Sequence, residues 1–128
     1  MAGLQKIFLV EDNAQILEIY TSTLNKFGYQ LMTATTVDDA LAKVAAFQPD
    51  IIFLDIMLPG GRSGLDALKI LRTDPAYGCT TKKIVLLTNL GLNDKLQKAW
   101  DEYADGYVVK AEIVPHELID IIRSFETN

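Results

Sequence analysis

The feature of the sequence that most limits the fold is an apolar run from Ile51 to Leu58 that contains one charged residue, Asp55. A run of this length that ends in Pro-Gly-Gly is typical of a strand buried on both faces of a parallel sheet. Because an unpaired carboxylate inside such a strand would cost several kcal/mol, we expect Asp55 at the strand's carboxyl end, where the chain leaves the sheet. Ligands of open α/β sheets bind at that edge, so Asp55 is a candidate site residue.

The rest of the chain predicts four further strands that alternate with helices. Apolar runs predict strands at 6–10, 29–34, 83–87 and 107–110, and apolar residues at helical spacing predict helices at 16–27, 37–47, 65–71, 93–103 and from Pro115 onward. Gly28 suits a left-handed helix cap, and Thr36 with Asp39 suits a helix start. This alternation predicts an α/β fold, a flavodoxin-like doubly wound five-stranded parallel sheet of order 2-1-3-4-5 with five helices.

The composition indicates one ordinary globular domain spanning residues 1–128, with 49% hydrophobic and 23% charged residues. A net charge of −5 argues against a direct nucleic-acid or anionic membrane surface and favours a partner with a cationic patch. The single cysteine, Cys79, cannot form an internal disulfide. With no signal-peptide core and no apolar run near the roughly 20 residues of a membrane span, we expect a cytoplasmic protein.

Four of the predicted strands lead to polar residues at their carboxyl ends: Glu11 and Asp12, Asp55, Thr88, and Lys110. In the predicted sheet these side chains would meet at one edge, where two carboxylates about 4 Å apart repel by roughly 4 kcal/mol. A divalent cation relieves this repulsion, and a ligand set made only of oxygen selects a hard ion such as Mg²⁺. We expect Asp12 and Asp55 to bind it directly, Glu11 through water, and one main-chain carbonyl after Asp55 to complete the protein ligands.

The same residues suit phosphoryl transfer, in which negative charge spreads over three phosphoryl oxygens. The metal, the Lys110 ammonium and the Thr88 hydroxyl with a loop amide could each neutralise one oxygen, while Asp55 acts as nucleophile and forms an aspartyl phosphate. Each residue alone has an ordinary explanation, since Asp12 and Thr88 could be helix caps and Lys110 could be solvated. The combination is more specific because each residue follows a different strand of one fold.

The chain resembles the receiver domain of two-component response regulators over essentially its whole length. The motifs that carry the resemblance are Val10-Glu-Asp-Asn13, Leu54-Asp-Ile-Met-Leu-Pro59, Leu87-Thr88 and Asp105-Gly-Tyr-Val-Val-Lys110. The resemblance implies transfer of a phosphoryl group from a histidine kinase or phosphotransfer protein to Asp55. It implies Mg²⁺ held by Asp12, Asp55 and the main chain at Met57. It further implies a phosphoacceptor that assists its own phosphorylation and dephosphorylation, not an enzyme acting on other molecules.

The resemblance also assigns a switch to Thr88 and Tyr107, although Tyr107 by itself is an ordinary strand aromatic. Phosphorylation would draw Thr88 toward the phosphoryl group and turn the Tyr107 ring inward behind it. The face built from residues 93–103, 107–110 and the last helix would change as a result. That face is the candidate surface for a downstream protein target or for a symmetric homodimer. The sequence identifies neither the kinase nor the target.

Three positions depart from the family pattern. The loop 59–64 is one residue longer than usual, and Asn89 follows Thr88 where a small residue is common. Ala111 follows Lys110 where the family has a cis proline, and a cis bond before a non-proline residue costs about 2.5–4 kcal/mol. We therefore predict a trans Lys110–Ala111 bond and a rearranged segment up to Pro115.

Other functions remain open at the level of sequence. An aspartyl-nucleophile phosphatase would need a second Asp where this chain has Met57, and a flavin-binding module would need a phosphate cradle where it has Glu11-Asp12. A receiver-like module could bind a partner without being phosphorylated, although the complete set of site residues argues against it. The chain could act alone or form part of a longer protein.

Overall fold

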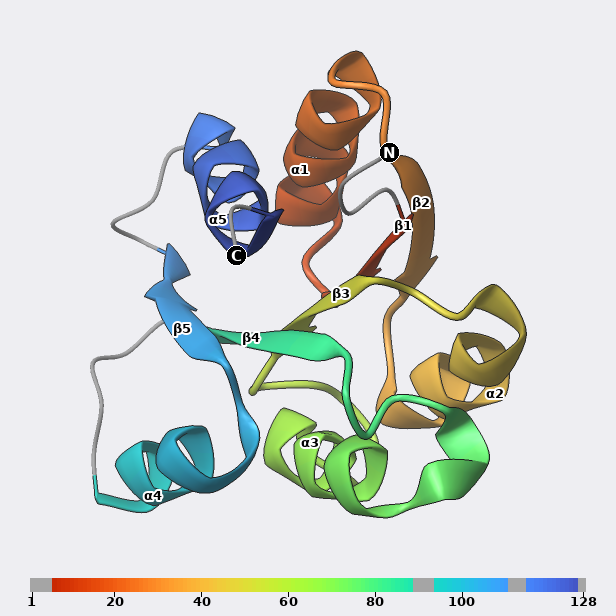
Figure 1. The fold of residues 1–128 in the computed structure, drawn as a ribbon, viewed down its shortest axis with the longest axis vertical. Coiled ribbons are helices and arrows are strands. Elements are labelled where there is room, and N and C mark those ends of the chain that lie inside the picture. Colours follow the sequence, from red (N-terminus) through yellow and green to blue (C-terminus); the bar gives the residue numbers. More distant parts are fainter. Residues whose placement is uncertain (1–5, 89–93, 111–114, 127–128) are drawn as a thin grey trace.

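The computed structural model describes residues 6–88, 94–110 and 115–126 (Figure 1). The strands are β1 (Lys6–Val10), β2 (Gln30–Ala34), β3 (Ile51–Asp55), β4 (Lys83–Thr88) and β5 (Gly106–Val109). The helices are α1 (Ala14–Lys26), α2 (Val37–Phe47), α3 (Gly64–Thr73), the short 3-10 helix η1 (Pro75–Tyr77), α4 (Asp94–Tyr103) and α5 (His116–Glu126). Asn89 and the Lys110–Ala111 bond, at which two of the predicted departures fall, lie outside the described residues.

The strands form one parallel sheet of order β2-β1-β3-β4-β5, which confirms the predicted topology. Figure 1 shows α1 and α5 together on one face of the sheet, and α2, α3 and α4 on the other. The connection through α1 leads to one side of β1, whereas those through α2, α3 and α4 run in the opposite direction along the sheet, so right-handed crossovers place them on opposite faces. Every residue of the central strand β3 is consequently buried. Among the described residues, no helix is long and apolar enough to cross a bilayer.

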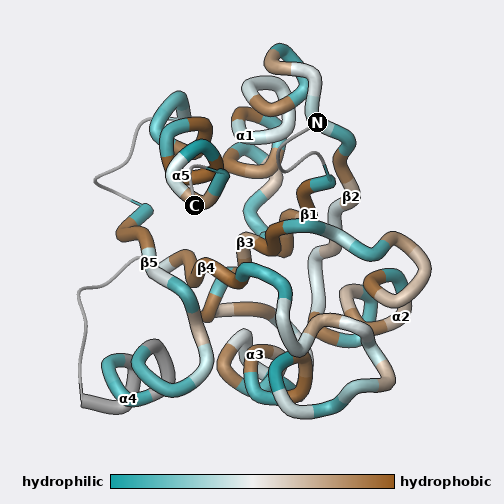
Figure 2. Tube along the Cα trace, viewed as in Figure 1, coloured by the Kyte–Doolittle hydropathy of each residue, from teal (hydrophilic) through white to brown (hydrophobic). Residues whose placement is uncertain are grey.

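The core has two halves because successive strand residues point to opposite faces of the sheet. Phe8, Ile52 and Leu86 pack beneath α2 and α3, whereas Leu9, Phe53 and Leu87 pack beneath α1 and α5. The central strands are therefore apolar on both faces, as Figure 2 shows by their brown colour. The sequence pattern of continuous apolar runs thus reflects burial on both sides, and Asp55 ends the most buried of these strands.

Local signals at the helix ends largely match the predictions. The Thr36 hydroxyl accepts a hydrogen bond from the Asp39 amide at the start of α2, and Gly28 adopts a left-handed conformation with φ of +87°. Helix α1 differs from the expectation that Asp12 might cap it, because Asn13 accepts the capping hydrogen bond from the Ile16 amide. Asp12 is therefore not needed as a cap, which leaves its carboxylate available at the edge of the sheet.

Between α3 and β4 the chain forms the 3-10 turn η1, an element that the sequence patterns did not predict. Pro75 supplies the fixed φ that suits a first helical position, and the Asp74 side chain accepts a hydrogen bond from the Ala76 amide. The last helix begins at His116, one residue after the predicted start, and Pro115 contributes its carbonyl oxygen to the first turn.

Candidate functional site

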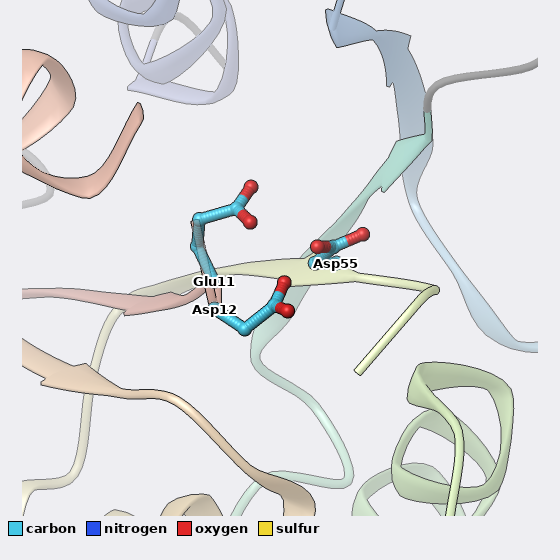
Figure 3. A group of neighbouring side chains, drawn as sticks. All are labelled: Glu11, Asp12 and Asp55. Atoms are coloured by element: carbon cyan, nitrogen blue, oxygen red, sulfur yellow. The ribbon is translucent and has the colours of Figure 1, made fainter. Parts of the chain in front are cut away.

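The candidate site is built by the carboxyl ends of four strands. Asp55 is the last residue of β3 and Thr88 the last of β4, while Glu11 and Lys110 directly follow β1 and β5. Figure 3 shows the carboxyl groups of Glu11, Asp12 and Asp55 turned toward one another. The structure thus brings together residues up to 99 positions apart in the sequence, as the topology predicted.

Lys110 lies between two carboxylates in the interior of this edge. Its ammonium nitrogen is 2.8 Å from Glu11 Oε1 and 3.1 Å from Asp55 Oδ2. All three side chains are almost completely buried, with Glu11 at 0%, Asp55 at 2% and Lys110 at 4% exposure. A buried lysine is stable only when its charge is paired, and these two contacts provide the pairing. Lys110 is therefore not the solvated surface lysine that was the alternative from sequence.

Glu11 is oriented by two donors, one on each carboxylate oxygen. Lys110 donates to Oε1, and the Asn13 amide donates to Oε2 at 3.0 Å. Because both oxygens already accept hydrogen bonds, Glu11 is suited to hold Lys110 in place and to contact an ion through water. Asn13, which also caps α1, belongs to the Val10–Asn13 motif, but no supporting role was predicted for it.

Asp55 also accepts two hydrogen bonds, each 3.1 Å long. Lys110 donates one to Oδ2, and the Met57 amide donates the other to Oδ1. The Met57 contact turns the chain after β3 back over the carboxylate. The Met57 side chain itself is 66% exposed, so its backbone carries the interaction and its side chain faces outward.

The excess of negative charge shows in the protonation of these groups. Burial, followed by the neighbouring Glu11 carboxylate, raises the pKa of Asp55 from 3.8 to about 7. Burial also opposes ionisation of Glu11, but hydrogen bonds from Lys110 and the Asn13 amide outweigh it and lower the pKa of Glu11. Burial likewise disfavours the Lys110 ammonium, yet its bonds to both carboxylates raise the pKa of Lys110. The site therefore holds more carboxylates than Lys110 alone can neutralise.

This arrangement fits a hard divalent cation. Glu11, Asp12 and Asp55 each offer a carboxylate oxygen, and these atoms all lie within 4.8 Å of one another. A pocket of about 330 Å³ opens beside them, lined also by Asn13, Met57 and Lys110. Asp12 is exposed, so it can reach the ion at low desolvation cost, and the donor set contains only oxygen.

The two candidate switch residues lie on the adjacent strands β4 and β5. Thr88 is 3% exposed at the end of β4, which neighbours β3, and Asp55 pairs in register with Leu87 immediately before it. Tyr107 lies on β5 and is 37% exposed. Thr88 thus lies at the edge that carries Asp55, whereas Tyr107 lies on the adjacent strand three residues before Lys110.

Gly64 supports the site in a way that the sequence analysis missed. A Cβ atom at this position would lie 2.0 Å from the Asp55 carbonyl oxygen and 2.7 Å from Ile56 Cα. The Gly64 amide also donates to the Ile56 carbonyl at 2.8 Å. Only glycine permits this approach, which closes the loop after Asp55 against the end of β3. The only local signal was a glycine beside Ser63 at the start of a helix.

Comparison with known proteins shows the same family over almost the whole chain. Residues 7–123 match the response regulator receiver domain. The chain is 34% identical over 122 residues to the phosphate regulon transcriptional regulatory protein PhoB of Klebsiella pneumoniae, a match covering 94% of this chain and 51% of PhoB. It is 32% identical over 123 residues to the DNA-binding response regulator MtrA of Mycobacterium tuberculosis, covering 94% and 50%. The chain thus spans about half the length of these curated relatives.

Solved structures agree with the sequence match. The chemotaxis response regulator CheY4 of Vibrio cholerae superposes with a TM-score of 0.82 at 27% identity, covering 94% of this chain and 98% of CheY4. The beryllofluoride-activated receiver domain of Klebsiella pneumoniae RstA also gives a TM-score of 0.82 at 27% identity, covering 97% and 100%. Fold, sequence match and the acidic cluster beside Lys110 lead to one conclusion: the chain belongs to the family of response regulator receiver domains.

Proposed function

We propose that this domain is a phosphorylation-dependent signalling switch in which Asp55 accepts a phosphoryl group from a phosphohistidine. The observation that carries the proposal is the buried contact of Lys110 with both Glu11 and Asp55, beside the exposed carboxylate of Asp12. The cluster combines three carboxylates with one ammonium and so keeps an excess of negative charge. Such an excess suits a site that gains a cation and then a phosphoryl group.

Asp55 is the nucleophile of the proposed reaction. One of its carboxylate oxygens bonds to phosphorus while the bond from phosphorus to the donor imidazole breaks, and the imidazole nitrogen keeps the electron pair and takes a proton from water. Water later attacks the same phosphorus, the bond to Asp55 breaks, and inorganic phosphate leaves. Asp55 is thereby regenerated as a carboxylate.

The other residues position charge around this oxygen. Lys110 is held by Glu11 within 3.1 Å of Asp55, so its ammonium can pair with a phosphoryl oxygen after only a small movement. The Thr88 hydroxyl at the end of β4 would contact a second oxygen. Asp12, Asp55 and the main chain at Met57 would hold Mg²⁺, with Glu11 acting through water. When bound, Mg²⁺ would neutralise phosphoryl charge and orient the donor.

The output would be a change in the face formed by α4, β5 and α5, transmitted through Thr88 and Tyr107. We propose a histidine kinase or phosphotransfer protein as donor, and a protein target or second copy of the domain on that face. The domain would assist its own phosphorylation and dephosphorylation without acting as an enzyme on other molecules. Its charge of −5 disfavours direct contact with nucleic acid, and we propose a cytoplasmic location.

A phosphate-affinity gel tests the proposal. The parent protein is incubated with acetyl phosphate and Mg²⁺, and Asp55→Asn is run beside it. Asp38→Asn is the matched control, because it makes the same chemical change at a side chain that is 83% exposed, on α2. We expect a shifted band for the parent and for Asp38→Asn, none for Asp55→Asn, and loss of the shift when EDTA replaces Mg²⁺. An unshifted parent would refute phosphotransfer and would support a module that binds its partner without phosphate.

A further inference from the structure

The side chain of Arg72 joins three separate parts of the fold at the end of the sheet opposite to Asp55. From the last turn of α3, its Nε donates to the Tyr103 carbonyl at 2.6 Å, and its Nη1 donates to the Thr80 and Lys82 carbonyls at 3.0 and 2.8 Å. Its Nη2 lies 2.8 Å from Asp105 Oδ2. The Arg72 side chain is only 17% exposed, and its bonds to Tyr103 and Lys82 are partly buried, whereas those to Thr80 and Asp105 are open to solvent.

Asp105 extends this network into the sheet. Its Oδ2 also accepts from the Ile84 amide at 2.8 Å, and its own amide donates to the Ile84 carbonyl at 2.8 Å. Asp105 thereby aligns the start of β5 with the start of β4. β5 is a four-residue edge strand with β4 as its single neighbour in the sheet. The bonds from Asp105 to Ile84 therefore help to fix the register of β5 against β4.

The two ends of β5 are therefore held by different contacts. Asp105 and Arg72 hold the start, and the ion pairs of Lys110 with Glu11 and Asp55 hold the end. Arg72 also holds the last residue of α4, Tyr103, beside the same point, and Figure 1 shows α4 lying next to α3 before the chain enters β5. A rearrangement that begins at Lys110 thus meets a fixed point at Tyr103 and Asp105.

We propose that Arg72 and Asp105 are positioning residues that form the fixed end of the switch. They hold the carboxyl end of α4 and the start of β5 while the opposite end of β5 responds to Asp55. The part of this inference that concerns phosphorylation rests on the proposed function, whereas the anchoring itself can be measured in the unmodified protein. The anchoring and its role in phosphorylation can therefore be refuted independently of each other.

Amide hydrogen exchange in residues 97–103 and 106–109 tests the anchor. Arg72→Gln removes the ion pair with Asp105 and most of the hydrogen-bond donors of the side chain. Arg62→Gln is the matched control, because it makes the same change at an exposed ion pair with Asp38. We expect exchange in these two segments to be at least tenfold faster in Arg72→Gln and within twofold of the parent in Arg62→Gln. Equal acceleration throughout the chain, or no acceleration, would overturn the anchor. Should Arg72→Gln not fold, Asp105→Asn decides the question by the same readout.

Beryllofluoride with Mg²⁺, as a phosphoryl mimic, tests the link to switching. In the parent we expect exchange at 101–103, the carboxyl end of α4 that Arg72 holds, to change less than twofold when the mimic is added, and in Arg72→Gln to change at least fivefold. A parent in which residues 101–103 respond more than twofold would show that this end is not fixed. A parent that is never phosphorylated would refute the proposed function, yet the exchange measured without the mimic would still establish or refute the anchor.

Discussion

Replacing Asp55 with asparagine should stabilise the protein when no divalent ion is present, although it removes the candidate phosphoryl acceptor. In the folded protein the pKa of Asp55 rises from 3.8 to about 7, chiefly because the carboxyl is buried and secondly because Glu11 lies beside it. Each pKa unit corresponds to about 1.36 kcal/mol, so ionised Asp55 costs at most about 4 kcal/mol of folding free energy. Asparagine carries no charge and avoids this cost.

The pH dependence follows from the direction of the shift. A carboxyl whose pKa is higher in the folded than in the unfolded state retains its proton on folding between about pH 4 and pH 7. The folded state then binds more protons, and stability falls as the pH rises through this window. Asp55→Asn should therefore match the parent near pH 4 and exceed it above pH 7.

Thermal and urea unfolding, followed by circular dichroism at pH 4.5 and 8 in EDTA, measure this difference. Because asparagine replaces only part of the hydrogen bonding of the carboxylate, we expect a gain of about 2 kcal/mol or more at pH 8, which is about 8 °C in Tm for a chain of this size. Asp38→Asn, at an exposed site, should change stability by less than about 1 kcal/mol. A variant no more stable than the parent at pH 8, or a gain independent of pH, would refute the reasoning.

Three further predictions address the other parts of the site. Lys110→Met leaves Glu11 and Asp55 without their buried cation, so it should lower the free energy of unfolding by about 3–5 kcal/mol in urea titrations, and an unchanged midpoint would contradict the pairing. Gly64→Ala places a Cβ 2.0 Å from the Asp55 carbonyl oxygen, so calorimetry should show Mg²⁺ binding weakened at least tenfold. The control Gly61→Ala, where a Cβ meets nothing within 4 Å, should bind Mg²⁺ as tightly as the parent does. Because a proton competes for Asp55 below its pKa of about 7, Mg²⁺ affinity should fall as the pH drops from 8 to 6, and a flat profile would exclude Asp55 as a ligand.

Sequence reasoning succeeded where a local pattern has one physical meaning. Alternation of apolar runs with helical spacing leads to a parallel sheet with helices on both faces, and the sheet order follows from short right-handed crossovers. The position of Asp55 at the end of β3 also followed, since an unpaired carboxylate has no stable place inside a strand buried on both faces. From these two steps alone, Glu11, Asp12 and Lys110 were expected at the same edge.

Several details could not be obtained in this way because they depend on contacts between distant residues. No pattern near Arg72 indicates that its guanidinium reaches Tyr103 and Asp105, more than 30 positions away. Gly64 is an ordinary helix-start glycine in sequence, and only the return of the loop onto the Asp55 carbonyl makes a Cβ impossible there. Residue type sets what a side chain can bind, but its neighbours decide what it does bind.

The amino-acid sequence by itself determined the fold class, the edge at which polar side chains gather, and the hard-ion chemistry of that edge, because periodicity and burial cost are properties of short segments. Tertiary structure alone decided how those side chains share their charges. Glu11 has both oxygens taken by donors, one from the neighbouring Asn13 and one from Lys110, 99 positions away. Asp55 consequently shares its lysine with a second buried carboxylate. Burial, and then the neighbouring Glu11, raise the pKa of Asp55, although the hydrogen bond from Lys110 lowers it.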